Sequence, residues 1–325
     1  MEINEKNIKL WSKLGPRATL GLCALDIAKT NKNLLIITCD VSTSAGLDRY
    51  RKTFTDQYID LGIAEQNMIG VATGLASENF DVITTTFAPF QTMRCCEQIK
   101  VNLGYMQEKI TMVGLASGLI LGNLGFTHCC IEDLGVMRSI PNIKIISPAD
   151  SLETIKAVEA SIKNDSSCYI RLTGGANCEA LYNKDYNFEI GKSITLKDGE
   201  DITIFGSGVI LSECLKAANI LDQKGFSTKV INMHTVKPID KDAIKNSCKK
   251  SKLLISVEEH NVIGGISSAI SETISQIKNS PVLLQFGIND TYSKSGSYDY
   301  LKKYYGLTHK KIIENALKVL NNNHE

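Results

Sequence analysis

A carboxylate with few charged neighbours stands at the start of a predicted helix. Residues 57–61 are typical of a short strand, and after Gly62 the apolar residues recur with the spacing of one helix face. Glu65 opens that helix, where the helix dipole favours a negative charge. A lone glutamate at a helix start usually serves the dipole, so a chemical role requires partner residues elsewhere in the chain.

Two later segments carry side chains suited to binding a flat ligand and moving protons. Phe87 and Phe90 flank a predicted strand-to-helix turn, and aromatic rings there can stack on a heterocycle. His128 follows a loop broken by three glycines, and histidine exchanges protons near neutral pH. Each group alone is more often structural, so these residue types by themselves do not establish an active site.

The run Gly62-Ile63-Ala64-Glu65-Gln66-Asn67-Met68 resembles the motif of the transketolase family, thiamine-diphosphate enzymes that move two-carbon ketol units. The resemblance extends from about Arg17 to the C-terminal helix and covers the C-terminal half of a full-length transketolase. It implies that Glu65 hydrogen-bonds a ring nitrogen of the aminopyrimidine and so promotes removal of the thiazolium proton. It also implies that His128 faces substrate hydroxyls and is catalytic.

The same resemblance implies which residues bind the cofactor and the sugar. Phe90 would stack on the aminopyrimidine, and the other expected cofactor contacts are Phe87, Ile63, Asp40 and Arg94. Arg94 follows Phe90 by one helical turn and is within reach of Glu97. Arg17, Ser44 and His128 match positions that bind substrate.

Half of the cofactor site has no counterpart in this sequence. Transketolases hold Mg²⁺ and diphosphate through Gly-Asp-Gly and a later Asn, and no Gly-Asp-Gly occurs here. No metal site is therefore expected on this chain. The resemblance implies thiamine diphosphate and Mg²⁺ shared with an N-terminal transketolase subunit, most simply as an α2β2 assembly acting on sugars.

The segments expected to hold the sugar's terminal phosphate depart from the family pattern. The usual histidine before the glycine loop is Ala116, and the usual acid within that loop is Leu124. The usual arginine after the strand ending near Leu172 falls at Gly174 or Gly175, and Arg171 should point elsewhere. Lost charge-assisted bonds weaken phosphate binding, so we expect a ketose donor with an uncharged tail or another anion such as a sulfonate.

The order of predicted elements indicates an α/β fold. Strands alternate with helices in both halves, which predicts two doubly wound domains with mainly parallel sheets. We expect a pyrimidine-binding domain over residues 1–175, a linker over 176–200 and a transketolase C-terminal domain over 201–325. One helix is expected from about residue 90 to 105.

Composition excludes several other classes of protein. The 325 residues carry a net charge of +1, which argues against a nucleic-acid partner. No run of 18 apolar residues and no signal-peptide core occur, so we expect a cytoplasmic protein without membrane association. The ten cysteines show no C-x-x-C and are expected to be reduced, structural thiols.

Other interpretations remain open from the sequence alone. Gly206-Ser207-Gly208 is half of a dinucleotide fingerprint and is better explained as a tight turn. Glu258-Glu259-His260-Asn261 resembles a family motif that supports assembly. The alternatives are the β-subunit of a 2-oxo acid dehydrogenase, a deoxyxylulose-phosphate-synthase-like enzyme and, in a different class, a non-catalytic α/β scaffold.

Overall fold

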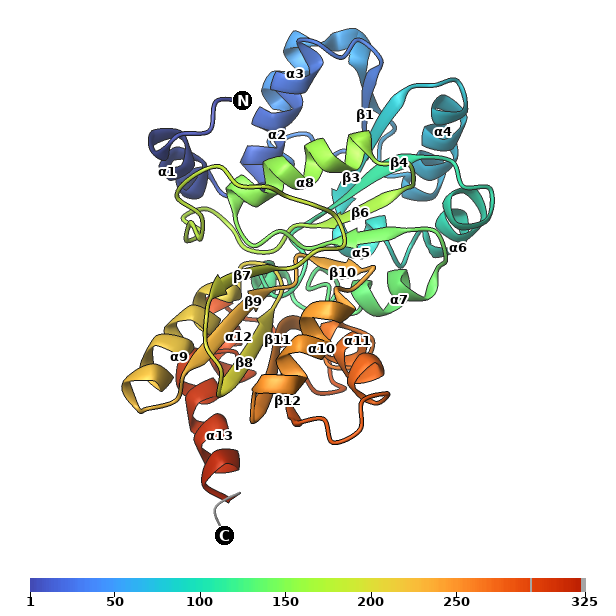
Figure 1. The fold of residues 1–325 in the computed structure, drawn as a ribbon. Coiled ribbons are helices and arrows are strands. Elements are labelled where there is room, and N and C mark those ends of the chain that lie inside the picture. The colour runs from blue at the N-terminus through green and yellow to red at the C-terminus, as the bar shows by residue number, and fades with distance from the viewer. Residues whose placement is uncertain (293, 323–325) are drawn as a thin grey trace.

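The computed structural model contains two mainly parallel sheets, each covered by helices. It describes residues 1–292 and 294–322. The N-terminal domain (blue to green in Figure 1) lies beside the C-terminal domain (gold to red). This arrangement confirms the expected pair of doubly wound α/β domains. The expected C-terminal domain, 201–325, includes residues 293 and 323–325, which lie outside the described residues.

The first sheet has the strand order β10-β5-β6-β4-β3-β1-β2, and only β10 runs antiparallel to its neighbour. Its strands are β1 (Leu34–Thr38), β2 (Tyr58–Asp60), β3 (Asp81–Phe87), β4 (Ile110–Leu115), β5 (Lys144–Ile146), β6 (Cys168–Arg171) and β10 (Thr235–Lys237). Its helical elements are α1 (Glu5–Leu14), α2 (Pro16–Ala28), α3 (Asp48–Thr53), η1 (Thr55–Gln57), α4 (Glu65–Ser77), α5 (Ala88–Gln91), α6 (Cys96–Gln98), η2 (Ile99–Tyr105), η3 (Gly122–Leu124), α7 (Asp133–Ser139) and α8 (Ser151–Lys163).

The second sheet has the order β12-β11-β8-β9-β7, with β7 antiparallel to β9. Its strands are β7 (Ile194–Lys197), β8 (Ile202–Gly206), β9 (Thr228–Asn232), β11 (Leu253–Asn261) and β12 (Val282–Ile288). Its helices are α9 (Leu211–Gln223), α10 (Lys241–Lys250), α11 (Ile266–Ile274), α12 (Tyr298–Tyr304) and α13 (His309–Asn322). Strand β7 lies inside the expected linker 176–200, so the last part of that segment belongs to the second sheet.

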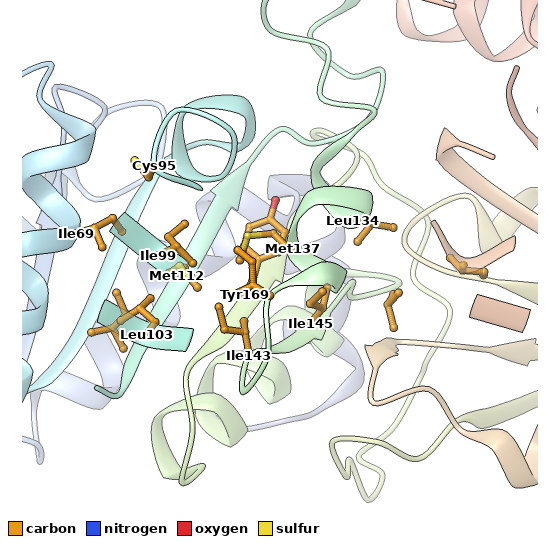
Figure 2. Close-up of a cluster of buried hydrophobic side chains, with 14 of the residues drawn as sticks. Ile69, Cys95, Ile99, Leu103, Met112, Leu134, Met137, Ile143, Ile145 and Tyr169 are labelled. Carbon is orange, nitrogen blue, oxygen red and sulfur yellow. The ribbon is translucent and has the colours of Figure 1, made fainter. Parts of the chain in front are cut away.

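Alternate residues of the first sheet's strands enter two separate cores, which is why these strands read as continuous apolar runs. Ile37 and Met112 pack on the side of α4 and η2, whereas Ile36 and Val113 pack on the side of α2 and α8. Figure 2 shows the first of these cores, where Ile69, Ile99, Leu103 and Met112 lie together. This core continues into the second domain through residues such as Phe205 and Leu254.

Buried polar groups also join the two domains. Arg171 pairs with Asp133 at 2.8 Å, and its Nη2 donates to the carbonyl oxygens of Cys130 and Glu259. The Arg171 guanidinium is therefore fully engaged by Asp133 and these two carbonyl groups. His260 Nε2 accepts a 3.1 Å bond from the backbone N–H of Leu134 in the first turn of α7.

The prediction of one continuous helix over residues 90–105 is wrong. Helix α5 ends at Gln91, and a turn precedes α6 and the π-helical segment η2. Thr92 Oγ1 donates to the Ala88 carbonyl and Cys95 Sγ to the Phe90 carbonyl, so side chains take up acceptors at the break. The break releases Arg94 from a helical position.

Candidate active site

The candidate catalytic residues gather at the carboxyl-terminal edge of the first sheet. Asp40 follows β1, Glu65 follows β2, Phe87 ends β3, and His128 lies in the loop after β4. These strands are parallel neighbours in the order β4-β3-β1-β2, so their carboxyl ends lie along one edge. Ligands of open α/β sheets characteristically bind at this edge.

Glu65 is buried at the first position of α4, with 3% of its surface exposed. The turn before it is held by Asp60, whose Oδ1 accepts from the backbone N–H groups of Asp40 (3.0 Å) and Gly62 (2.9 Å). Burial alone would raise the pKa of Asp60, but these hydrogen bonds lower it below its usual value. Asp40 adopts φ 55° and Gly62 φ 65°, so Asp60 stabilises two left-handed residues beside Glu65.

Sequence reasoning assigned no role to Asp60. A signal was present, because an aspartate at the end of a predicted strand and two residues before a glycine is typical of a turn clamp. The structure shows that this clamp joins the ends of β1 and β2. It therefore determines where α4, and with it Glu65, begins.

Three rings form the aromatic part of the site. The Phe90 centroid lies 6.4 Å from that of Phe87 and 5.4 Å from that of His128, and Phe87 and His128 are 5.9 Å apart. All three contacts are edge-to-face, the favoured geometry for such pairs. The His128 Nδ1 lies 3.0 Å from Thr127 Oγ1, which orients the imidazole and leaves Nε2 for another partner.

Arg94 connects these rings to Glu65. Its Nη1 donates to Glu65 Oε2 at 2.8 Å, and its guanidinium carbon lies 4.0 Å from the Phe90 ring centroid. The expected alternative partner, Glu97, instead accepts from Gln98. The structure thus brings Glu65, Arg94, Phe90, Phe87 and His128 into one group of contacting residues.

The remaining predicted residues lie at the margins of this group. Ile63 is 76% exposed, and Asp40 is also exposed. Arg17 is half-buried in the first turn of α2, and in the described part of the chain its guanidinium forms no ion pair. Burial lowers the pKa of Arg17 below its usual value. Across the described residues, the side chains of Arg17 and Ser44 form no hydrogen bond, ion pair or ring contact with the aromatic group.

Arg17 and Ser44 nevertheless belong to adjacent segments. The loop that carries Ser44 ends at Gly46, where a Cβ would lie 3.0 Å from the Arg17 carbonyl oxygen. Gly15, just before α2, lies against the Gly175 carbonyl. The segments that carry Arg17, Ser44 and Gly175 therefore adjoin one another.

The same region explains which clamp position can carry a side chain. Gly174 has φ 74°, and a Cβ there would lie 2.9 Å from a Val209 methyl. Gly175 has no such backbone restriction, and its Cβ would lie 3.2 Å from the flexible end of Ile120. An arginine is therefore excluded at 174 without rearrangement and is tolerable at 175.

Other sequence features have structural roles. Gly206-Ser207-Gly208 is a buried turn in which Gly208 lies against Thr173 and Ser147, so the tight-turn interpretation holds. None of the ten cysteines, all of which lie within the described residues, forms a disulfide bond. Within residues 1–292 and 294–322, no group of three or more His, Cys, Asp or Glu side chains is arranged to hold a metal ion. No helix in that described portion is long and apolar enough to cross a membrane.

Comparison with known proteins matches both domains. Residues 13–177 match the transketolase pyrimidine binding domain, and residues 191–312 match the transketolase C-terminal domain. The chain is 34% identical over 306 residues to a putative transketolase C-terminal section of Methanocaldococcus jannaschii, covering 94% of this chain and 96% of that one. It is 34% identical over 296 residues to a 6-deoxy-6-sulfo-D-fructose transketolase subunit of Clostridium sp., covering 91% of each.

A solved structure agrees with these matches. It is described as a split gene transketolase in an inactive β4 tetramer, superimposes with a TM-score of 0.85 at 30% identity, and covers 95% of this chain and 98% of that one. Membership of the family implies thiamine diphosphate as cofactor. The chain belongs to the transketolase family and is a subunit of a split transketolase.

Proposed function

We propose that this chain supplies the pyrimidine half of a thiamine-diphosphate site in which a second polypeptide supplies the diphosphate and Mg²⁺ half. The observation that carries the proposal is the buried Glu65 carboxylate joined to Phe90 through Arg94, at the edge where four parallel strands end. A flat, hydrogen-bonding cation already fits between Glu65 and Phe90. The residues present therefore suit an aminopyrimidine ring.

When bound, thiamine diphosphate supplies a nucleophilic carbon and an electron sink for cleaving and forming the ketol bond. Glu65 would hold a proton at its carboxyl group and donate it to a ring nitrogen. Phe90 and Phe87 would fix the ring by stacking and by edge contact. His128, oriented by Thr127, would exchange protons with substrate hydroxyls through Nε2.

Substrate binding would involve Arg17, Ser44 and His128. A half-buried guanidinium without an ion pair in the described residues is costly unless an anion meets it. We infer that Arg17 meets an anionic group of the sugar. Ala116 is buried, Leu124 is exposed, and neither carries a charge, so Arg17 is the one cation proposed to remain of what is usually a set of phosphate-binding groups.

We propose that the donor is a ketose whose tail is either uncharged or an anion other than an ordinary sugar phosphate, such as a sulfonate. Two relatives of similar identity are named for different tails. One is the sulfofructose transketolase subunit, and the other is an apulose-4-phosphate transketolase subunit of Phocaeicola vulgatus at 32% identity, covering 90% of this chain and 94% of that one. The loss of charged side chains at positions 116 and 174–175 favours a sulfonate tail over a phosphate tail.

The proposed assembly is α2β2 and cytoplasmic, with the exposed Ile63 covered by the partner subunit. The experiment is reconstitution of the purified chain with an N-terminal transketolase subunit, thiamine diphosphate and Mg²⁺, followed by ketol-transfer assays. We expect activity from the pair and none from either chain alone. Robust transfer by this chain alone with cofactor and Mg²⁺ would contradict the proposal.

Steady-state kinetics on alternative donors test the substrate class. We expect the pair to prefer 6-deoxy-6-sulfofructose over fructose 6-phosphate and xylulose 5-phosphate. A kcat/KM of about 10⁴ M⁻¹s⁻¹ or more on either phosphate, the ordinary range for enzymes, would refute this part.

A further inference from the structure

The Arg94 side chain occupies a position that the proposed chemistry does not explain. Its guanidinium lies 4.0 Å from the Phe90 ring centroid and also donates to Glu65 at 2.8 Å. These are the two residues to which an aminopyrimidine contact is assigned. Glu65 is nearly enclosed at 4% side-chain exposure, whereas Arg94 is 41% exposed on its outer side.

The backbone allows Arg94 to leave this position. Arg94 lies in the turn between α5 and α6, where its N–H makes a long 3.3 Å bond to the Pro89 carbonyl. The neighbouring Cys95 is buried and bonds to the Phe90 carbonyl, which anchors the turn on both sides of Arg94. The side chain can therefore swing toward solvent while the turn and Phe90 remain in place.

We propose that in the free chain the Arg94 guanidinium occupies the binding position of the aminopyrimidine, and that cofactor binding displaces it. This inference rests on the proposed function. Guanidinium and aminopyrimidine are both planar, both stack on an aromatic face and both hydrogen-bond to a carboxyl group. Because both need the same side of Glu65 and Phe90, only one of them is accommodated at a time.

A change of charge accompanies the exchange. Arg94 is the cation that balances the Glu65 carboxylate in the free chain. Among the described residues, the thiols of Cys39 and Cys95 interact electrostatically with Glu65, and burial raises their pKa values to about 11 and about 12, so both are neutral. Once Arg94 leaves, the enclosed Glu65 carboxyl group no longer has its cation and is available to the ring nitrogen, which is the role that the proposed function assigns to it.

The decisive variant is Arg94→Met in the reconstituted two-chain enzyme, with thiamine diphosphate affinity measured by calorimetry. We expect the Kd to fall roughly tenfold, equivalent to about 1.4 kcal/mol, because the cofactor no longer displaces a side chain. We also expect the melting temperature of the free variant chain to fall, because it loses the ion pair. Arg94→Lys, which keeps the charge but not the planar stack, should give an intermediate affinity.

Two controls make the result specific. Arg49→Met removes an exposed arginine of α3 and should change neither quantity. Wild-type titrations in buffers of different ionisation enthalpy should show uptake of about one proton per cofactor bound, and Arg94→Met should show less. The wild-type part of this measurement does not depend on any variant folding.

The outcomes separate the two proposals. An unchanged or higher Kd in Arg94→Met and Arg94→Lys, with wild-type binding intact, overturns the displacement of Arg94 alone. It would mean that Arg94 stays on Glu65 in the loaded enzyme. Failure of the wild-type pair to bind thiamine diphosphate overturns the proposed function and this inference together.

Discussion

Replacing Glu65 by alanine separates a chemical role from a structural one. Proton transfer by a positioned side chain contributes about 10²–10⁴-fold to a rate. At 1.36 kcal/mol per factor of ten, that corresponds to about 2.7–5.4 kcal/mol of transition-state stabilisation. We expect Glu65→Ala to lose activity by this factor in the reconstituted enzyme.

The expected loss of stability is much smaller. Glu65 opens α4, where a carboxylate contributes about 0.3–1 kcal/mol through the helix dipole. Its ion pair involves an arginine that is 41% exposed, so that pair contributes only about 0.2–1 kcal/mol. The melting temperature should therefore fall by only a few degrees, since 1 kcal/mol shifts a domain of this size by about 2–4 °C.

The assay is exchange of the thiazolium proton of bound thiamine diphosphate with solvent deuterium, followed by NMR. Glu65→Ala should slow this exchange, and Glu65→Gln should slow it as well, because an amide can hydrogen-bond but cannot relay the proton. Glu97→Ala is the matched control, since Glu97 is exposed and, within the described residues, its carboxylate accepts a hydrogen bond only from Gln98. Exchange at the wild-type rate in Glu65→Ala would refute the assignment.

Three further predictions concern other parts of the molecule. Asp133→Asn should cost about 3–5 kcal/mol in chemical denaturation, because it leaves the fully buried Arg171 without its counter-ion; a loss under 1 kcal/mol would contradict this. Burial raises the pKa of Asp150 to about 6 from its usual 3.8, so the folded state binds the Asp150 proton more tightly than the unfolded state does. The free energy of unfolding of the wild type, relative to Asp150→Asn, should therefore fall by up to about 3 kcal/mol as pH rises from 4 to 6. A difference that grows with pH would contradict this prediction. Gly175→Arg should lower the KM for fructose 6-phosphate in the two-chain enzyme, because residue 175 borders a cavity of about 310 Å³ with room for a side chain; Gly175→Met serves as the uncharged control, and an equal effect of both would exclude a role for the charge.

The fold was largely predictable because its strands are buried on both faces. Runs such as Leu34–Thr38 and Ile110–Leu115 carry β-branched or apolar residues throughout and end close to the expected positions. Strands β7 and β10 escaped prediction because each is a short edge strand that, unlike the short edge strand β2, pairs antiparallel and so lies outside the regular alternation of parallel strands and helices. The partner of β10 is β5 of the other domain, and no local pattern encodes such a pairing.

The candidate site was predictable residue by residue but not in its contacts. Glu65, Phe87, Phe90 and His128 were each identifiable from a motif. The bond between Arg94 and Glu65 spans 29 positions and depends on the break after α5. A continuous helix would direct Arg94 toward Glu97, so the break after α5 also determines which carboxylate Arg94 meets.

The departures from the family pattern bear on specificity through charge. A tail phosphate is normally held by several cationic and hydrogen-bonding groups, each charge-assisted bond contributing about 1.5–3 kcal/mol. Here Gly174 is packed against Val209 in a left-handed conformation that excludes an arginine, and Arg17 remains as an unpaired cation within the described residues. One cation still attracts a monoanion, but a dianionic phosphate loses more of its binding energy than a singly charged sulfonate when the other donors are absent. The packing around Gly174 therefore supports the proposed tail of low charge at this one position, whereas residue 175 has room for a side chain and is the position that the Gly175→Arg variant tests.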